Sequence, residues 1–245
     1  MAQLSFIVPA HNEEVLLGAT LSSIHHASRN IAESIEIIVV DDASTDSTVA
    51  VARSYGARTV SVDRRQIAAA RNAGSREATG DWLIFVDADT RISKRLLGAT
   101  LSALKTGAIG GGCRISFDGR LPLYARALIG VLEPIYGRLG LAAGCFVFCT
   151  RAGFELVGGF DETMYAAEEV VLSKALHHEG RFVILRETAV TSGRKLRTYT
   201  AAQVLGGLLR LAIGGRAAFQ RREGMELWYG ERRNEQEVKD RSARL

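Results

Sequence analysis

The first third of the chain alternates short, mostly apolar runs with longer segments of helical periodicity. The apolar runs, which predict strands, cover residues 4–8, 35–40, 58–62 and 82–86. The segments between them predict helices over 13–28, from Ser44 or Thr45 to 55, and over 66–78. Largely apolar strands separated by helices predict a parallel sheet with helices on both faces.

The pattern after residue 92 is less regular. We expect helices over 93–105, 121–140 with an interruption near Pro134, 168–179 and about 200–222. Strands are expected over 107–117, 142–150, 183–185 and 189–191. The glycines at 110–112 suggest a flexible segment, so 110–120 and 186–200 are candidate lids over a site.

Ligands of parallel α/β sheets bind beyond the carboxyl ends of the strands. Polar and acidic residues gather at those ends in this chain, at 10–14, 41–48 and 87–90. The functional site is therefore expected at this edge of the sheet. We expect one domain over 1–222, made of a ligand-binding half (1–92), a second half (93–199) and a basic amphipathic helix (200–222). A charged tail (223–245) follows.

Composition narrows the class of protein. The 245 residues are 47% hydrophobic and 24% charged, which is typical of a soluble globular chain. Three cysteines without a C-x-x-C pair disfavour a disulfide scaffold or a structural zinc site and fit a reducing compartment. No signal segment opens the chain, so we expect a cytoplasmic protein, with the inner face of the membrane as its other location.

The net charge of +4 is unevenly distributed. Residues 181–222 carry nine basic side chains and one acidic one. Such a block indicates a phosphate-bearing partner or an anionic membrane, and a solvated helix face explains it equally well. No aromatic interleaving supports nucleic-acid binding, so that partner is not expected.

Asp87 and Asp89 follow the apolar strand at 82–86. Two carboxylates so close repel one another unless a cation lies between them, and Mg²⁺ or Mn²⁺ suits such oxygen ligands. Helix capping is the alternative interpretation. Asp41 and Asp42 end the second strand, where a carboxylate can accept hydrogen bonds from a base or a ribose, and turn formation accounts for the residues after them. The chain has no G-x-G-x-x-G after the first strand and no P-loop.

Five blocks of sequence together resemble the family-two glycosyltransferases, which have the GT-A fold. They are FIVPAHNEE (6–14), VDDASTD (40–46), ARNAG (70–74), ATGDWLIFVDAD (78–89) and GGFDE (158–162). The resemblance covers about residues 4–192 and implies a nucleotide-sugar-dependent, typically inverting transferase. It places Pro9, Ala10 and Glu13 against the nucleoside and Asp42, or else Asp41, at the base. It also places Arg71 facing the nucleotide, and Asp87 and Asp89 on the metal and ribose side.

The resemblance also implies a catalytic base, at the start of the helix after the GGFDE block. The matching residues are Glu168 and Glu169, with Glu169 at the position of the base and Glu168 as the fallback. Adjacent glutamates can have pKa values that are pushed apart, which leaves one able to accept a hydroxyl proton. Complementarity to the helix dipole is the alternative explanation.

This chain departs from many relatives where they supply a histidine to the metal. Thr191, Arg194 and Lys195 occupy the corresponding region. Either a hydroxyl and water complete the coordination, or the basic pair neutralises the diphosphate directly. The expected cofactor is a divalent metal, Mg²⁺ or Mn²⁺.

The predicted function is transfer of a sugar from a nucleoside-diphosphate sugar, with a UDP-sugar favoured, to an acceptor hydroxyl with inversion. The acceptor is a saccharide, a lipid or a small molecule, and segment 200–222 is expected to contact a membrane peripherally. Two alternatives stay open. One is a GT-A-like module that binds nucleotide sugar without transferring it, and the other is a nucleotidyltransferase.

Overall fold

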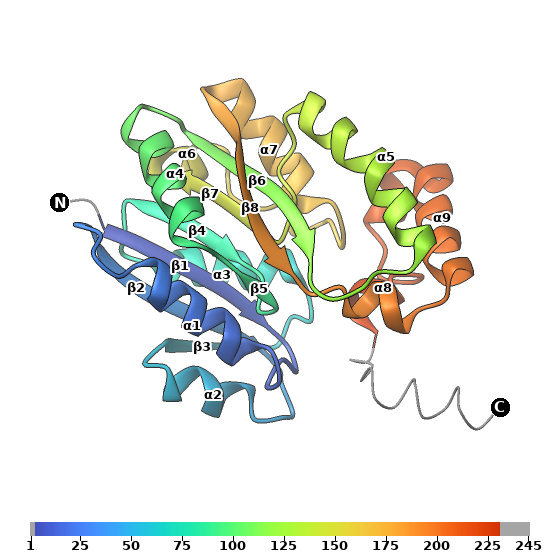
Figure 1. Cartoon of the computed structure of the whole chain (residues 1–245), viewed down its shortest axis with the longest axis horizontal. Coiled ribbons are helices and arrows are strands. Elements are labelled where there is room, and N and C mark those ends of the chain that lie inside the picture. Colours follow the sequence, from blue (N-terminus) through green and yellow to red (C-terminus); the bar gives the residue numbers. More distant parts are fainter. Residues whose placement is uncertain (1–2, 231–245) are drawn as a thin grey trace.

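The computed structural model describes residues 3–230, and it centres on one eight-stranded sheet (Figure 1). The strand order is β3-β2-β1-β4-β7-β6-β8-β5. The strands are β1 (Gln3–Ala10), β2 (Ser34–Asp42), β3 (Arg58–Val62), β4 (Trp82–Val86), β5 (Thr90–Arg91), β6 (Gly110–Phe117), β7 (Phe146–Thr150) and β8 (Phe182–Thr191). β1 to β4 are parallel to one another, β7 is antiparallel to both its neighbours, and β6 and β8 are parallel. The expected parallel sheet is thus found in the first half, and the second half is mixed.

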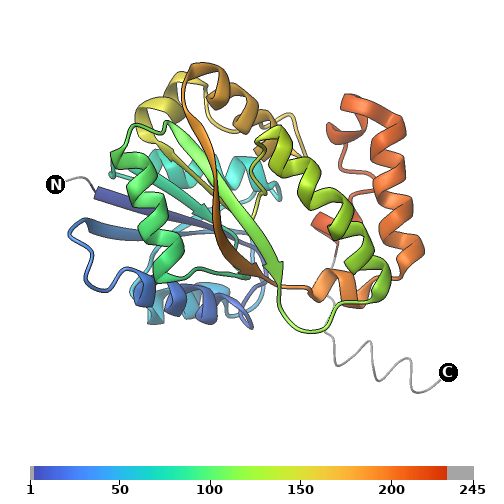
Figure 2. The same cartoon turned by 45° about the horizontal axis from the view of Figure 1, so that its top comes forward.

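Helices cover both faces of the sheet and one end of it (Figures 1 and 2). They are α1 (Leu17–Ala27), α2 (Thr48–Ser54), α3 (Ile67–Glu77), α4 (Lys94–Lys105), α5 (Leu123–Leu139), α6 (Arg151–Leu156), α7 (Glu168–Glu179), α8 (Arg194–Thr198), α9 (Ala201–Phe219) and α10 (Glu226–Tyr229). Side chains from α1, α2 and α4 share one buried cluster, and those from α3, α6 and α7 share another. Alternate residues of β1 enter opposite clusters, Phe6 and Val8 the first and Ile7 the second.

Two glycines allow elements to approach one another closely. A Cβ on Gly74 would lie 2.8 Å from Val40 Cγ2 and closer still to Ile7, so α3 packs tightly on β1 and β2. A Cβ on Gly80 would lie 2.6 Å from the carbonyl oxygen of Gln3. Gly80 therefore serves the contact between β4 and β1, and it lies beyond the C-cap of α3, which is Ala78.

Several expected boundaries are wrong. α1 begins at Leu17 after a turn over 13–16, and α2 begins at Thr48, beyond the expected caps Ser44 and Thr45. α5 continues through Pro134. Its flanking residues are exposed, so water can satisfy the carbonyl that proline leaves unbonded. The two short strands expected over 183–191 form one strand, β8, which carries a register shift opposite Cys113 and Arg114.

The glycine run at 110–112 is not a flexible segment. These residues pair with both β7 and β8. A Cβ on Gly111 would collide with the carbonyl oxygen of Val183, and one on Gly112 would lie 2.6 Å from Ala142 Cβ. The glycines are therefore required by close strand packing in the middle of the sheet. A lid is not supported over this part of 110–120.

The start of the predicted tail is folded against the body. Met225 is buried with Ala166 and Leu211, and the ring of Tyr229 packs edge-on to Tyr165 at 5.7 Å. The remainder of the tail, residues 231–245, lies outside the described residues. No helix within residues 3–230 has the length and apolar character needed to cross a membrane.

Candidate active site

The acidic loops meet at the carboxyl ends of β1, β2 and β4, as the topology requires. Ala10 at the end of β1 pairs with Asp41 at the end of β2, and Asp87 follows β4 directly. The loop after β4 is held from two sides. Thr20 donates its hydroxyl to the carbonyl oxygen of Ala88 at 2.8 Å, and the backbone N–H of Asp87 donates to Cys145.

Arg71 is the central side chain of this region. It lies on α3 and is 2% exposed. Its guanidinium donates to Glu168 Oε1 at 2.8 Å, to Asp87 Oδ1 at 2.7 Å and to the carbonyl oxygen of Gly144 at 2.7 Å. The resemblance implied that Arg71 faces the nucleotide. The structure instead buries Arg71 beneath the site, where it joins Asp87, in the loop after β4, to Glu168 at the start of α7.

The GGFDE block supports Arg71 from below. The guanidinium lies 5.1 Å from the centre of the Phe160 ring, within the range of a cation–π contact. The neighbouring Asn72 donates to the carbonyl oxygen of Phe160 and accepts from its backbone N–H. A Cβ on Gly159, whose φ is +77°, would lie 2.9 Å from Asn72 Oδ1. These contacts fix the block of 158–162 against α3.

Glu168 and Glu169 open α7 and have different surroundings. Glu168 is buried and paired with Arg71, whereas the Glu169 carboxylate lies against Gly144, where a Cβ would be 3.3 Å from Glu169 Cδ. Burial and the charge of Glu168 raise the pKa of Glu169 to about 8, with Arg71 opposing the shift. Burial also raises the pKa of Glu168, and Arg71 again opposes it.

The residue before this pair adopts an unusual backbone conformation. Ala167 is the N-cap of α7 and has φ +60° and ψ +20°. A non-glycine residue in the left-handed region costs free energy, and such strain is held by the surrounding structure. The start of α7 is therefore set by a strained turn directly next to the two glutamates.

Asp89 lies in a second group of charges. Glu13 from the loop after β1 forms an ion pair with Arg194 of α8, with N–O distances of 3.0 and 3.1 Å to its two carboxylate oxygens. Thr191 donates its hydroxyl to Asp89 Oδ1 at 3.3 Å. Burial, then the charges of Glu13 and Asp87, raise the pKa of Asp89 to about 6, and Lys195 and Arg194 oppose this. A carboxylate in this position is stabilised by an added cation.

The two aspartates at the end of β2 differ in the number of backbone N–H groups that their carboxylates accept. Asp42 accepts three backbone N–H groups, from Arg64, Arg65 and Gln66, each at 2.8 Å. It therefore anchors the turn that leads into α3, and does not lie as the resemblance implied for a base-binding residue. Asp41 accepts the backbone N–H of Ser44 at 3.3 Å, through Oδ1.

A comparison with known families decides what kind of protein carries this arrangement. The model of "Glycosyl transferase family 2" matches residues 5–154, more than half of the chain. The chain belongs to glycosyl transferase family 2. The matched segment includes Arg71, Gly144 and both aspartates of the loop after β4, and it ends before the α7 glutamates.

Curated relatives of this family 2 chain are named as glycosyltransferases. A validoxylamine A glucosyltransferase from Streptomyces hygroscopicus subsp. limoneus is 32% identical over 128 residues, which are 49% of this chain and 28% of the relative. The chain spans less than a third of the length of the curated relatives that it matches first.

The solved structures establish the GT-A fold. The mannosyltransferase of Pyrobaculum calidifontis in complex with GDP-Man and Mn²⁺ has a TM-score of 0.64 and 20% identity, over 99% of this chain and 75% of that one. The glucosyl-3-phosphoglycerate synthase of Mycobacterium tuberculosis in complex with Mn²⁺, UDP and glucosyl-3-phosphoglycerate has a TM-score of 0.61 and 22% identity, over 94% and 80% of the two chains.

The two aspartates of this family 2 chain fit a divalent metal in part. Within residues 3–230 no cluster of three or more His, Cys, Asp or Glu side chains is placed to hold a metal. Asp87 and Asp89 supply hard oxygen ligands, one Asp87 oxygen is held by Arg71, and the raised pKa of Asp89 reflects a need for positive charge. Mg²⁺ usually keeps waters and substrate phosphates as its other ligands, so two carboxylates are a suitable set.

Some residues around the site were not predicted from the sequence. The carbonyl oxygen of Gly144 accepts a hydrogen bond from Arg71, and its lack of a side chain leaves space for Glu169. The only signal in the sequence is that a glycine stands just before β7. Tyr136 of α5 lies close enough for the Glu169 charge to raise its pKa together with burial. Tyr229, from the presumed tail, accepts the backbone N–H of Ile67 at 3.4 Å.

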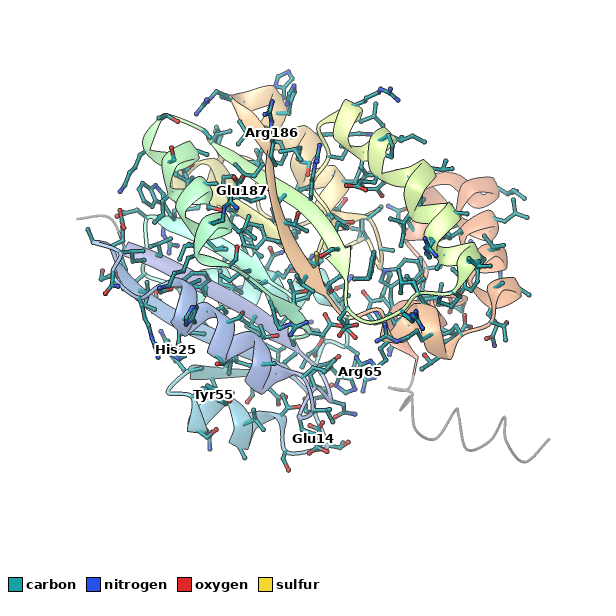
Figure 3. All side chains as sticks on the ribbon, in the orientation of Figure 1. Glu14, His25, Tyr55, Arg65, Arg186 and Glu187 are labelled. Atoms are coloured by element: carbon teal, nitrogen blue, oxygen red, sulfur yellow. The ribbon has the colours of Figure 1, made fainter. Side chains whose placement is uncertain are left out.

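The basic block of 181–222 does not act as one surface. Arg181 donates to carbonyl oxygens at the end of α4, and Arg197 pairs with Asp118 at 2.9 Å. Arg186 and Glu187 lie along β8, away from Glu14 and Arg65 at the edge where β1 to β4 end (Figure 3). Of the block, Arg194 and Lys195 are the residues whose charges act on Asp89.

Proposed function

We propose that this chain transfers a sugar from a nucleoside-diphosphate sugar to an acceptor hydroxyl by a single displacement with inversion. The observation that carries the proposal is the link through Arg71. One buried guanidinium holds Asp87, which follows β4, and Glu168, which precedes the candidate base. In this proposal the donor binds on the Asp87 side of the contact, and the proton is removed on the Glu168 side.

Glu169 is proposed as the catalytic base. Glu168 is paired with Arg71 at 2.8 Å, whereas the Glu169 carboxylate lies against Gly144. A base works best when its pKa lies near the working pH, and a carboxylate with a pKa of about 8 removes a hydroxyl proton more readily than an ordinary one. Arg71 and Glu168 are proposed as positioning residues.

Donor binding is assigned to the carboxyl ends of β1, β2 and β4. Asp87 and Asp89 would hold Mg²⁺ or Mn²⁺, which when bound neutralises charge on the diphosphate. Asp41 is proposed for the base in preference to Asp42, because Asp42 already accepts three backbone N–H groups. Pro9 and Ala10 line the nucleoside, and Glu13 holds Arg194 beside Asp89, where its guanidinium favours a diphosphate.

The donor is proposed to be a UDP-sugar. Support comes from the solved neighbour that holds UDP and Mn²⁺, while another neighbour holds GDP-Man, so both nucleotides belong in the test. Binding is measured as the shift in melting temperature with UDP, GDP and their sugars, each with and without Mn²⁺. A stabilisation by UDP that requires Mn²⁺ and disappears in Asp89→Asn is expected.

Transfer is tested by acceptor-dependent release of the nucleoside diphosphate. Glu169→Gln is expected to lower turnover about a hundredfold or more while leaving donor binding intact. Arg58→Gln, at an exposed ion pair far from the site, is the matched control. The anomeric configuration of the product, read by NMR, tests inversion. Donor binding without any transfer, across acceptors, would instead indicate a binding module, and pyrophosphate release would indicate a nucleotidyltransferase.

A further inference from the structure

The exposed apolar side chains of this protein are concentrated on two helices. Eight of the eleven large hydrophobic residues exposed within 3–230 lie on α5 or α9. Both helices project together at one end of the molecule in both views (Figures 1 and 2). We call α5 and α9 the helical lobe.

Each helix of the lobe presents an apolar stripe to solvent. The stripe of α5 is Val131, Ile135 and Leu139, and that of α9 is Leu205, Leu209 and Ile213. The residues in each stripe are four positions apart, so they lie on one face of their helix. They are between 44% and 78% exposed, where a solvated helix face normally carries charged residues.

The lobe is firmly attached to the body, so the stripes are not the result of an unpacked segment. Tyr124 of α5 donates its hydroxyl to the carbonyl oxygen of Leu196 at 2.7 Å. On its other face α9 buries Val204 and Leu211, and Leu211 packs with Ala166, next to the strained turn at Ala167. The backbone N–H of Tyr165 donates to Phe219 at 2.7 Å.

The charges of the lobe suit a negatively charged partner. Its two helices carry Arg126, Arg138, Arg210 and Arg216 against one acid, Glu133. A second copy of the lobe would bring these arginines together, which disfavours a dimer through this face. Residues 231–245 are also poorly suited to cover it, because Ala243, Val238 and Leu245 are their only aliphatic side chains.

We propose that the helical lobe docks on an anionic membrane surface, with both apolar stripes inserted among the lipids and the arginines at the headgroups. An apolar face flanked by arginines binds at such interfaces without spanning them. The surface extends beyond the 200–222 segment singled out in the sequence, because α5 contributes half of it. It lies next to the α7 glutamates, since the charge of Glu169 acts on Tyr136 of α5.

The test is cosedimentation of the full chain with vesicles of phosphatidylcholine, with and without phosphatidylglycerol. Binding to the anionic vesicles that weakens as salt is raised is expected. Changing Ile135, Leu139, Leu209 and Ile213 together to Gln should weaken binding about tenfold or more. Leu156→Gln, an equally exposed apolar site on α6, should leave binding unchanged.

The charge contribution is tested separately. Arg138→Gln with Arg210→Gln should weaken binding to anionic vesicles alone, whereas Lys94→Gln with Arg95→Gln, the same loss of charge on exposed positions of α4, should not. No vesicle binding at low salt, or unchanged binding of the stripe variant, would overturn the proposal. So would a dimer in solution that the stripe variant dissolves. Donor-dependent melting shifts in the same variants report on the proposed transferase site independently.

Discussion

Arg71 is 2% exposed and forms ion pairs with Asp87 and Glu168, which come from different parts of the chain. Its removal leaves Glu168 buried without its cation, and breaking a buried pair in this way costs about 3–5 kcal/mol. Arg71→Met is expected to lower the free energy of unfolding by about that amount, measured by urea denaturation. Arg58→Met, which breaks the exposed pair with Glu77, should cost at most about 1 kcal/mol.

Adding Glu168→Gln to Arg71→Met should recover part of the loss, because no ionised glutamate is then left buried. Equal costs for the Arg71 and Arg58 variants would show that Arg71 is no more than another surface arginine. Nothing in the sequence marks the burial of this one arginine among many.

Glu169 links activity and stability through its pKa of about 8. Because this lies above the usual value of 4.5, the native state holds the proton more tightly than the unfolded chain. The stabilisation is complete below about pH 4.5 and is lost as the pH rises through about 8. Transfer, which needs the ionised form, should rise over the upper part of the same interval.

Glu169→Gln separates these two effects. This variant should show little transfer at any pH. Its melting temperature should fall less than that of the unchanged chain between about pH 6 and about pH 9, an interval that spans the transition. Parallel melting curves of the two proteins across this interval would count against the raised pKa.

At the scale of elements, the bounds of several regular strands and helices could be predicted from the sequence, whereas short helices and contacts between distant segments could not. β3, β4 and α7 have the bounds expected from their sequences. A continuous apolar run marks β4, and an acidic first turn marks α7. α6 and α8 have six and five residues, too few to show a period. Asp87, Asp89 and Glu169 could be chosen from the sequence, whereas Gly144 owes its place to contacts between distant segments.

The glycines of β6 give a prediction about an element. Gly111→Ala would place a Cβ against the Val183 carbonyl oxygen and should destabilise the fold by about 1–3 kcal/mol, as overpacking does. Gly98→Ala is the control, because Gly98 lies inside α4 with nothing within 4 Å of the added carbon. That change should stabilise by up to about 1 kcal/mol, as alanine does in a helix. Urea denaturation measures both, and a neutral Gly111→Ala would restore the view of 110–112 as a flexible segment.

For the whole molecule, the C-terminal segment up to residue 230 is part of the folded unit. Met225 is 1% exposed and packs with Ala166 and Leu211, so Met225→Ala should lower the free energy of unfolding by about 2 kcal/mol or more. Leu156→Ala, at an exposed apolar position, should have almost no effect. If Met225→Ala lowered the free energy of unfolding no more than Leu156→Ala does, the segment would contribute little to the fold.

The left-handed conformation of Ala167 has a consequence for anyone who engineers this protein. Ala167→Gly removes a steric conflict, so calorimetry should record an unchanged or slightly higher melting temperature, the gain amounting to at most about 1 kcal/mol. The same change gives the turn before Glu168 more freedom, and turnover should decline as the carboxylates lose their alignment. A screen for heat resistance alone would therefore select against performance at this position.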